Sequence, residues 1–158
     1  MADYLDLSAG LDADRSGAGD QRLQRCSAAA AELLPNPQIG KYRENQVLTA
    51  SREQLVVLTY DGILRFLGRA CRGLEAGDYH EKHLGLARAQ ALIMDLARSL
   101  DRAASPELAA NLSAVYAYWL DELATADAGD DQPRIQAIMA LVAELREAWA
   151  EVARRATP

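Results

Sequence analysis

The best candidate for a reactive site in this chain is a pair of histidines one helical turn apart. His80 and His83 flank Glu81 and Lys82, and on a helix both imidazoles would lie on one face. A structural or catalytic zinc ion needs three or four protein ligands, and no third or fourth ligand stands out here. Zinc protease helices also separate their histidines by four residues, around an internal glutamate. The pair is therefore interpreted as a solvated helix start, with a small metal-dependent helical enzyme using His80 and His83 as a distant alternative.

Other signatures of catalysis are missing from the sequence. There is no phosphate-binding loop, no G-x-S-x-G turn and no dinucleotide-binding fingerprint. The E-x-x-H repeats of di-iron helical bundles are also missing, and acidic pairs such as Glu144 and Glu147 fit a polar helix face. We therefore predict no catalytic residues, no metal and no cofactor, and a protein that is not an enzyme.

Composition points to one helical domain. The chain has 158 residues, half of them apolar, with only 10 glycines and 5 prolines. A net charge of −6 disfavours binding to nucleic acid, because that partner requires a positive contact face. Cys26 and Cys71 show no C-x-x-C spacing, which favours free thiols in a reducing compartment. No stretch approaches about 18 apolar residues and no signal peptide is evident, so we expect a cytoplasmic protein without membrane insertion.

Capping residues and apolar spacing predict four long helices. The first is expected over about 52–76, from Ser51 with its capping-box partner Gln54 to Gly77. The second starts after Asp78, with charges such as Lys82 mostly away from its apolar face. The third begins at Ser105-Pro106 and the fourth near Pro133, after a turn at 127–131.

The expected core of the third and fourth helices follows from three- and four-residue spacing. The residues predicted to be buried are Leu108, Leu112, Val115, Tyr116, Trp119, Leu120 and Leu123, then Ile135, Ile138, Val142, Leu145, Trp149 and Val152. Short turns between helices of this length favour antiparallel neighbours. The predicted fold class is all-α, an antiparallel up-and-down four-helix bundle with a short N-terminal helical leader.

The chain divides into an extension and a bundle. Residues 1–37 form an acidic N-terminal extension that we expect to be partly disordered, with a short helix over 23–34 that stops at Pro35 and Pro37. Residues 38–156 form the helical bundle.

The helix predicted at 52–76 carries more apolar surface than one face can hold. Four consecutive apolar residues at 55–58 point in every direction around a helix. This helix is either the centre of the bundle or one wall of a groove that takes an amphipathic helix or an extended peptide. Gly62 costs about 1 kcal/mol in a helix interior and suggests that another backbone passes close. Periodicity leaves both alternatives open.

A combination of residues around this helix is characteristic of one family. Tyr42 precedes the run N-Q-V-L-T-A-S at 45–51, and Tyr60-Asp61-Gly62 follows in the helix. These segments resemble the opening of the FliS family of flagellar secretion chaperones, in which a tyrosine precedes an N-x-V-x-T/S-A-S run and an L-Y-D/E-G helix. The likeness covers residues 38–153 and includes Lys82-His83 to Leu100, Asn111-Leu112, Tyr116, Tyr118, Leu145-Arg146 and Ala148-Trp149.

The resemblance implies a function. It implies an export chaperone that binds the disordered C-terminal region of flagellin in the cytoplasm, prevents premature polymerisation and assists delivery to the flagellar type III export apparatus. Flagellar export-gate or regulatory proteins are further expected partners, and a homodimer is left open. The predicted flagellin-binding groove comprises Tyr42, Val47, Leu48, Leu55, Leu58, Ile63 and Phe66, supported by Tyr116 and Trp119. For each of these residues, packing in the core is the alternative.

Two features depart from the family pattern. Arg52 occupies the position after the capping serine where the family commonly has proline, and residues 1–37 have no counterpart. By analogy with the family's leading segment, the helix expected at 23–34 would extend a cover over the groove. The alternative function is a FliS-like regulatory adaptor that sequesters another flagellar protein, with the extension as its specificity element.

Overall fold

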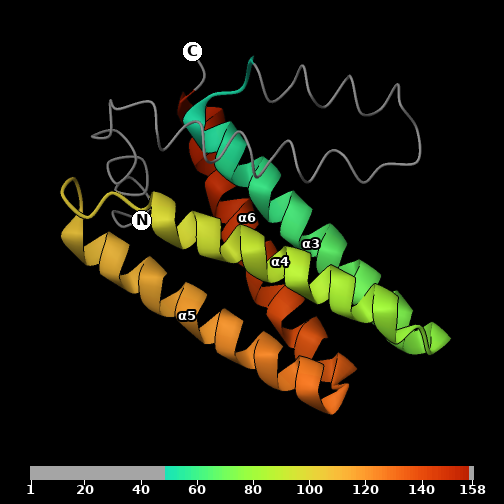
Figure 1. Cartoon of the computed structure of the whole chain (residues 1–158). Coiled ribbons are helices and arrows are strands. Elements are labelled where there is room, and N and C mark those ends of the chain that lie inside the picture. The colour runs from blue at the N-terminus through green and yellow to red at the C-terminus, as the bar shows by residue number, and fades with distance from the viewer. Residues whose placement is uncertain (1–48, 157–158) are drawn as a thin grey trace.

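The structure, a computed structural model, describes residues 49–156, and within this range it is all-α. Four helices follow one another, α3 (Arg52–Ala76), α4 (Tyr79–Ser99), α5 (Pro106–Gly129) and α6 (Gln132–Ala156). Short turns join successive helices, which therefore run in alternating directions (Figure 1). The predicted four-helix, all-α class is confirmed. The leader expected at 23–34 and Cys26 lie outside the described residues.

Helix α3 is the best-covered element of the bundle. It packs extensively against α4 and α6, while α5 packs less extensively against the same two helices, diagonally across from α3 (Figure 1). The hydrophobic core lies between the four helices and is built from apolar residues of all of them. The alternative in which the helix at 52–76 is the central one therefore accounts for much of its apolar excess.

Local chemistry sets the ends of α3 where the sequence predicted them. The Ser51 backbone N–H donates to Gln54 Oε1 at 2.9 Å, and the Gln54 backbone N–H donates to Ser51 Oγ at 3.3 Å. This reciprocal box satisfies donors that the first helical turn leaves without partners. At the other end Gly77 has φ 68°, a left-handed conformation that glycine adopts without steric cost.

The ends of α5 differ from the prediction. Ser105 precedes the helix and Pro106 opens it, but the Ser105 side chain makes no capping hydrogen bond. The turn expected at 127–131 is shorter, because α5 continues through Gly129. Asp130 takes the left-handed conformation at φ 49°, and the short polar side chain of aspartate tolerates this region better than most residues do. The reversal is thus confined to Asp130 and Asp131.

Two predicted burial assignments are wrong. Val115, expected in the core, is 37% exposed, because the buried stripe of α5 runs instead through Leu112, Tyr116, Trp119 and Leu123. Lys82, expected among the surface charges, has a side chain only 2% exposed. Leu108, Leu120 and Leu145 are half-buried at the edge of the core. In each case the neighbouring helices, which local periodicity does not specify, decide how much of a helix is covered.

Candidate functional site

The histidine pair lies at the end of the bundle where α3 turns into α4 and α5 turns into α6. His80 is exposed, and the Nδ1 atom of His83 lies 2.9 Å from Asp127 Oδ1. No group of three or more His, Cys, Asp or Glu side chains in residues 49–156 is arranged to hold a metal ion. The residue between the two histidines, Lys82, is the one that the structure buries.

Lys82 joins the two turns through its ammonium group. Its Nζ lies 3.0 Å from Asp127 Oδ1 and 2.5 Å from Asp130 Oδ1, and it donates to the Asp127 carbonyl at 2.9 Å. Burial lowers the pKa of Lys82, but its hydrogen bonds to Asp130 and Asp127 outweigh burial, so the net pKa is raised. A buried charge needs such partners, and the Lys82 cluster (Lys82, Asp127 and Asp130) is therefore structural.

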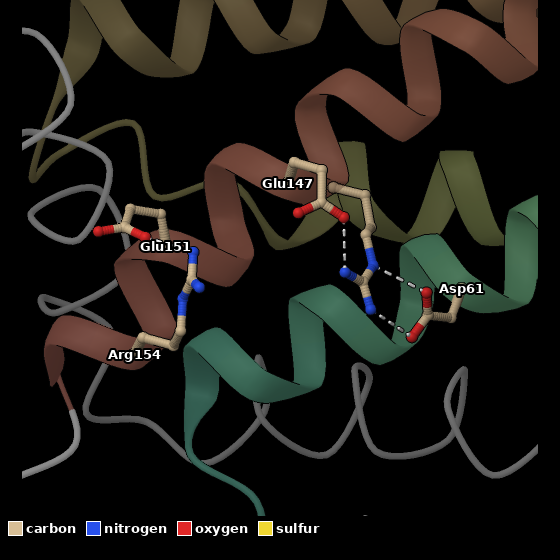
Figure 2. Close-up of polar contacts among 5 residues, drawn as sticks. Asp61, Glu147, Glu151 and Arg154 are labelled. Atoms are coloured by element: carbon tan, nitrogen blue, oxygen red, sulfur yellow. Dashed lines mark hydrogen bonds and ion pairs between the residues drawn. The ribbon is translucent and has the colours of Figure 1, made fainter.

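A second polar contact ties α3 to α6 near the middle of both helices. Arg146 Nε donates to Asp61 Oδ1 at 2.9 Å, and Arg146 Nη1 donates to Glu147 at 2.8 Å (Figure 2). Glu151 and Arg154 form another pair one turn further along α6 (Figure 2). Asp61, Arg146 and Glu151 are partly exposed, and Glu147 and Arg154 are largely exposed. We therefore expect these ion pairs to orient the side chains more than to stabilise the fold.

The residues predicted for the groove are mostly inside the bundle. Tyr42, Val47 and Leu48 lie outside the described residues. Leu58 is half-buried, packed at the edge of the core. The other five are almost completely buried, with exposures of 0–5%, namely Leu55, Ile63, Phe66, Tyr116 and Trp119. In this arrangement only Leu58, of the six described, has apolar surface that a partner can reach.

Tyr116 and Trp119 meet α3 at the centre of the bundle. The Tyr116 hydroxyl is hydrogen-bonded to the Tyr60 hydroxyl at 2.5 Å, and the Trp119 ring lies edge-on to Tyr60 with centroids 6.4 Å apart. Burial raises the pKa of Tyr116 to about 12, and burial also raises the pKa of Tyr60 well above its ordinary value. Both phenols thus stay protonated, and together they link α5 to the opposite helix.

We expect this hydrogen bond to contribute measurably to stability. Tyr60→Phe and Tyr116→Phe should each cost about 1–2 kcal/mol, because each leaves one buried hydroxyl without its partner. The double variant should cost less than the sum of the single variants, since it removes both polar groups together. Urea unfolding of the four proteins gives the coupling energy. Strictly additive losses would show that the two hydroxyls do not depend on each other.

Sequence reasoning missed several apolar side chains that are accessible. Val57 and Leu64 on α3 are half-buried, and five large apolar residues elsewhere are exposed, namely Tyr79, Met94, Val115, Tyr118 and Leu141. For Val115 and Tyr118 a signal existed, because no charged residue occurs between Glu107 and Asp121. A surface helix normally carries charge on its outer face, so a long uncharged stretch indicates an apolar surface.

Comparison with known proteins gives a consistent result. Residues 35–156 match the family model described as "Flagellar protein FliS". A "Flagellar secretion chaperone FliS" from Bacillus subtilis (strain 168) is 32% identical over 68% of this chain and 80% of its own length. Proteins of the same description from Escherichia coli (strain K12) and Salmonella typhimurium are each 33% identical. These alignments span 68% and 72% of this chain, and 80% and 85% of the respective relatives.

Proposed function

This chain belongs to the FliS family of flagellar secretion chaperones, and from that premise we propose that it is a cytoplasmic export chaperone for flagellin. It would bind the disordered C-terminal region of flagellin, prevent premature polymerisation and assist delivery to the flagellar type III export apparatus. The observation that carries the proposal is the family match, which spans all four described helices.

A chaperone of this kind would cover the apolar surface of the flagellin tail. An amphipathic tail that is disordered alone exposes apolar surface and self-associates until it is covered. Folding of such a tail against a helical bundle hides that surface, at a cost in conformational entropy that keeps the affinity moderate and the complex reversible. No helix in the described range is long and apolar enough to cross a membrane.

We propose that the flagellin groove follows α3. The apolar side chains of α3 that a partner could reach include the half-buried Leu58, Val57 and Leu64. Val57 and Leu64 are seven residues apart and share one face of the helix, while Leu58 lies about 100° further round it. The buried residues of the predicted groove, Leu55, Ile63, Phe66, Tyr116 and Trp119, would support the groove from the core. Tyr42, Val47 and Leu48 would extend the groove before the first turn of α3.

Substitution of Leu58 should show whether this side chain serves the groove or the core. Leu58→Glu is expected to keep the helical circular dichroism spectrum, since the side chain already lies at the core's edge, and to weaken binding of a flagellin tail peptide at least about tenfold. Leu141→Glu, an exposed leucine on α6, is the matched control and should bind as the wild type does. Equal binding by the two folded variants contradicts a groove at Leu58, and Leu58→Ser serves if the glutamate variant does not fold.

Affinity purification from the native cytoplasm tests the partner. The tagged full chain should recover flagellin, and addition of excess flagellin tail peptide should release it. Recovery of another flagellar protein without flagellin would contradict the proposal and support the regulatory adaptor. Export-gate proteins should appear only together with flagellin, because delivery follows loading.

A further inference from the structure

Glu53 is a buried charged side chain without a counter-charge in the described bundle. It lies in the first turn of α3 and is 8% exposed. It forms no hydrogen bond or ion pair with any residue in the range 49–156. A buried charge normally has a partner, because the loss of its hydration otherwise remains uncompensated. The burial of Glu53 therefore points to a partner outside this range.

The other covered carboxylates of the bundle all have partners. Each half-buried carboxylate in residues 49–156 accepts a hydrogen bond or forms an ion pair, namely Asp61, Glu81, Asp95, Asp101, Glu122, Asp127, Asp131 and Glu151. Three carboxylates without such a contact, Glu107, Asp121 and Glu144, are exposed, so water hydrates them. Within this range, Glu53 alone combines burial with the lack of a partner.

The Glu53 carboxylate can nevertheless be reached from outside. In the described range, Asp127 Oδ1 and Trp149 Nε1 are the fully buried side-chain polar atoms that lack a hydrogen bond, and the Glu53 oxygens are not among them. The oxygens therefore retain contact with solvent, while the rest of the side chain is covered. A carboxylate held in this way loses little conformational entropy when it binds a partner.

Glu53 continues the row of accessible apolar side chains on α3. Val57 and Leu64 follow it by four and eleven residues, so all three lie within about 40° of one another around the helix. Val57 and Leu64 are half-buried at the edge of the core. We propose that Glu53 is a recognition residue of the α3 groove, and that its carboxylate accepts hydrogen bonds from a lysine or arginine side chain of the flagellin tail. This inference rests on the proposed function and adds the charge of the client residue to it.

The same geometry predicts the spacing of the client residues. At 1.5 Å per residue, Leu64 lies about 10.5 Å beyond Val57 along the helix axis, and Glu53 lies about 6 Å before Val57. A helical client alongside α3 would therefore have two apolar residues seven positions apart, and a basic residue four positions beyond the one that contacts Val57. A charge-assisted hydrogen bond at this end fixes the register of the client in the groove.

Isothermal titration calorimetry of the full chain with a flagellin tail peptide tests the proposal. Glu53→Gln keeps the size of the side chain, removes its charge and should weaken binding about tenfold. The difference from the wild type should shrink as salt is added, because salt screens the contact that the wild type makes. Glu144→Gln makes the same charge change at an exposed position on α6 and, as the matched control, should bind as the wild type does.

Substitutions in the peptide identify the partner of Glu53. Each lysine and arginine of the tail is replaced singly by glutamine. One of these peptides should bind the wild type about tenfold more weakly than the unmodified peptide does, and the two peptides should bind Glu53→Gln equally well. The residue identified in this way should lie four positions from an apolar residue of the tail.

Wild-type affinity in the Glu53→Gln variant, or the lack of a basic tail residue coupled to Glu53, would overturn the inference while flagellin binding stands. A wild type that does not bind the tail peptide would contradict the proposed function as well. A third outcome concerns Lys41 and Arg43, which precede α3 in the sequence. If Lys41→Gln or Arg43→Gln destabilised the free protein and Glu53→Gln added nothing to that loss, the partner would belong to this chain and the inference would be wrong.

Discussion

Removal of both aspartates of the Lys82 cluster should destabilise the bundle by about 3 kcal/mol. Asp127→Ala with Asp130→Ala leaves the ammonium of Lys82 in a site where its side chain is 2% exposed, with only the Asp127 carbonyl as an acceptor. A buried charge that loses its counter-charges keeps the cost of its desolvation. Urea unfolding followed by circular dichroism measures the loss.

The control uses the difference in burial between Lys82 and its two aspartate partners. Lys82→Met should cost less than the double aspartate variant, because Asp127 and Asp130 are 33% and 46% exposed and can be rehydrated. Addition of Lys82→Met to the double variant should restore part of the lost stability, because it removes the unpaired charge. A Lys82→Met variant less stable than the double aspartate variant would contradict this account.

The Lys82 cluster should make the stability of the protein depend on pH in the alkaline range. The pKa of Lys82 in the folded protein lies above its ordinary value of 10.5. The charged Lys82 therefore contributes fully to the free energy of unfolding below pH 10.5, and this contribution is lost as the pH rises through the folded pKa. Above about pH 10.5 the wild type should therefore lose stability more steeply than Lys82→Met. The buried phenols Tyr60 and Tyr116 titrate in both proteins and cancel in this comparison.

Gly85→Ala should destabilise the protein by about 3 kcal/mol, although alanine is the better helix former. A Cβ atom at position 85 would lie 2.7 Å from the Phe66 carbonyl oxygen and 2.8 Å from the Ala70 nitrogen. Both are backbone atoms of α3, so the clash can be relieved only by separating α3 from α4. The measurement is the midpoint of urea unfolding at constant m-value.

Gly68→Ala is the matched control for Gly85→Ala. Its Cβ would lie 3.5 Å from Arg72 Nη1 and 4.0 Å from Met139 Cε, which are ordinary contacts with flexible side-chain ends. Here the gain in helix propensity should dominate and stabilise the protein by up to about 1 kcal/mol. If both substitutions changed the stability in the same direction, close packing of α4 against α3 would not explain the effect of Gly85→Ala.

Local chemistry explains which features could be predicted from the sequence. The ends of α3 depend on Ser51, Gln54 and Gly77, whose effects act within a few residues, and Pro106 opens α5 as expected. The all-α class follows from apolar spacing in the same way. These features do not require knowledge of which helices become neighbours.

Features that depend on neighbouring helices could not be predicted from spacing. Lys82 is buried because the α5–α6 turn supplies Asp127 and Asp130, about 45 residues away in sequence. Val115 is exposed because α5 has a narrow buried stripe. An apolar residue on α3 fits the same sequence pattern whether it faces the core or a partner. The burial of Leu55 and Ile63 could therefore be determined only from the structure.

Titration with flagellin and with flagellin lacking its C-terminal region tests the central claim most directly. Isothermal titration calorimetry of the purified full chain should show saturable binding of intact flagellin, with a negative heat-capacity change from burial of apolar surface. The isolated tail peptide should reproduce that binding, and truncated flagellin should show none. Undiminished binding of truncated flagellin, or no binding of intact flagellin, would contradict the proposal that this chain is a chaperone of the flagellin tail.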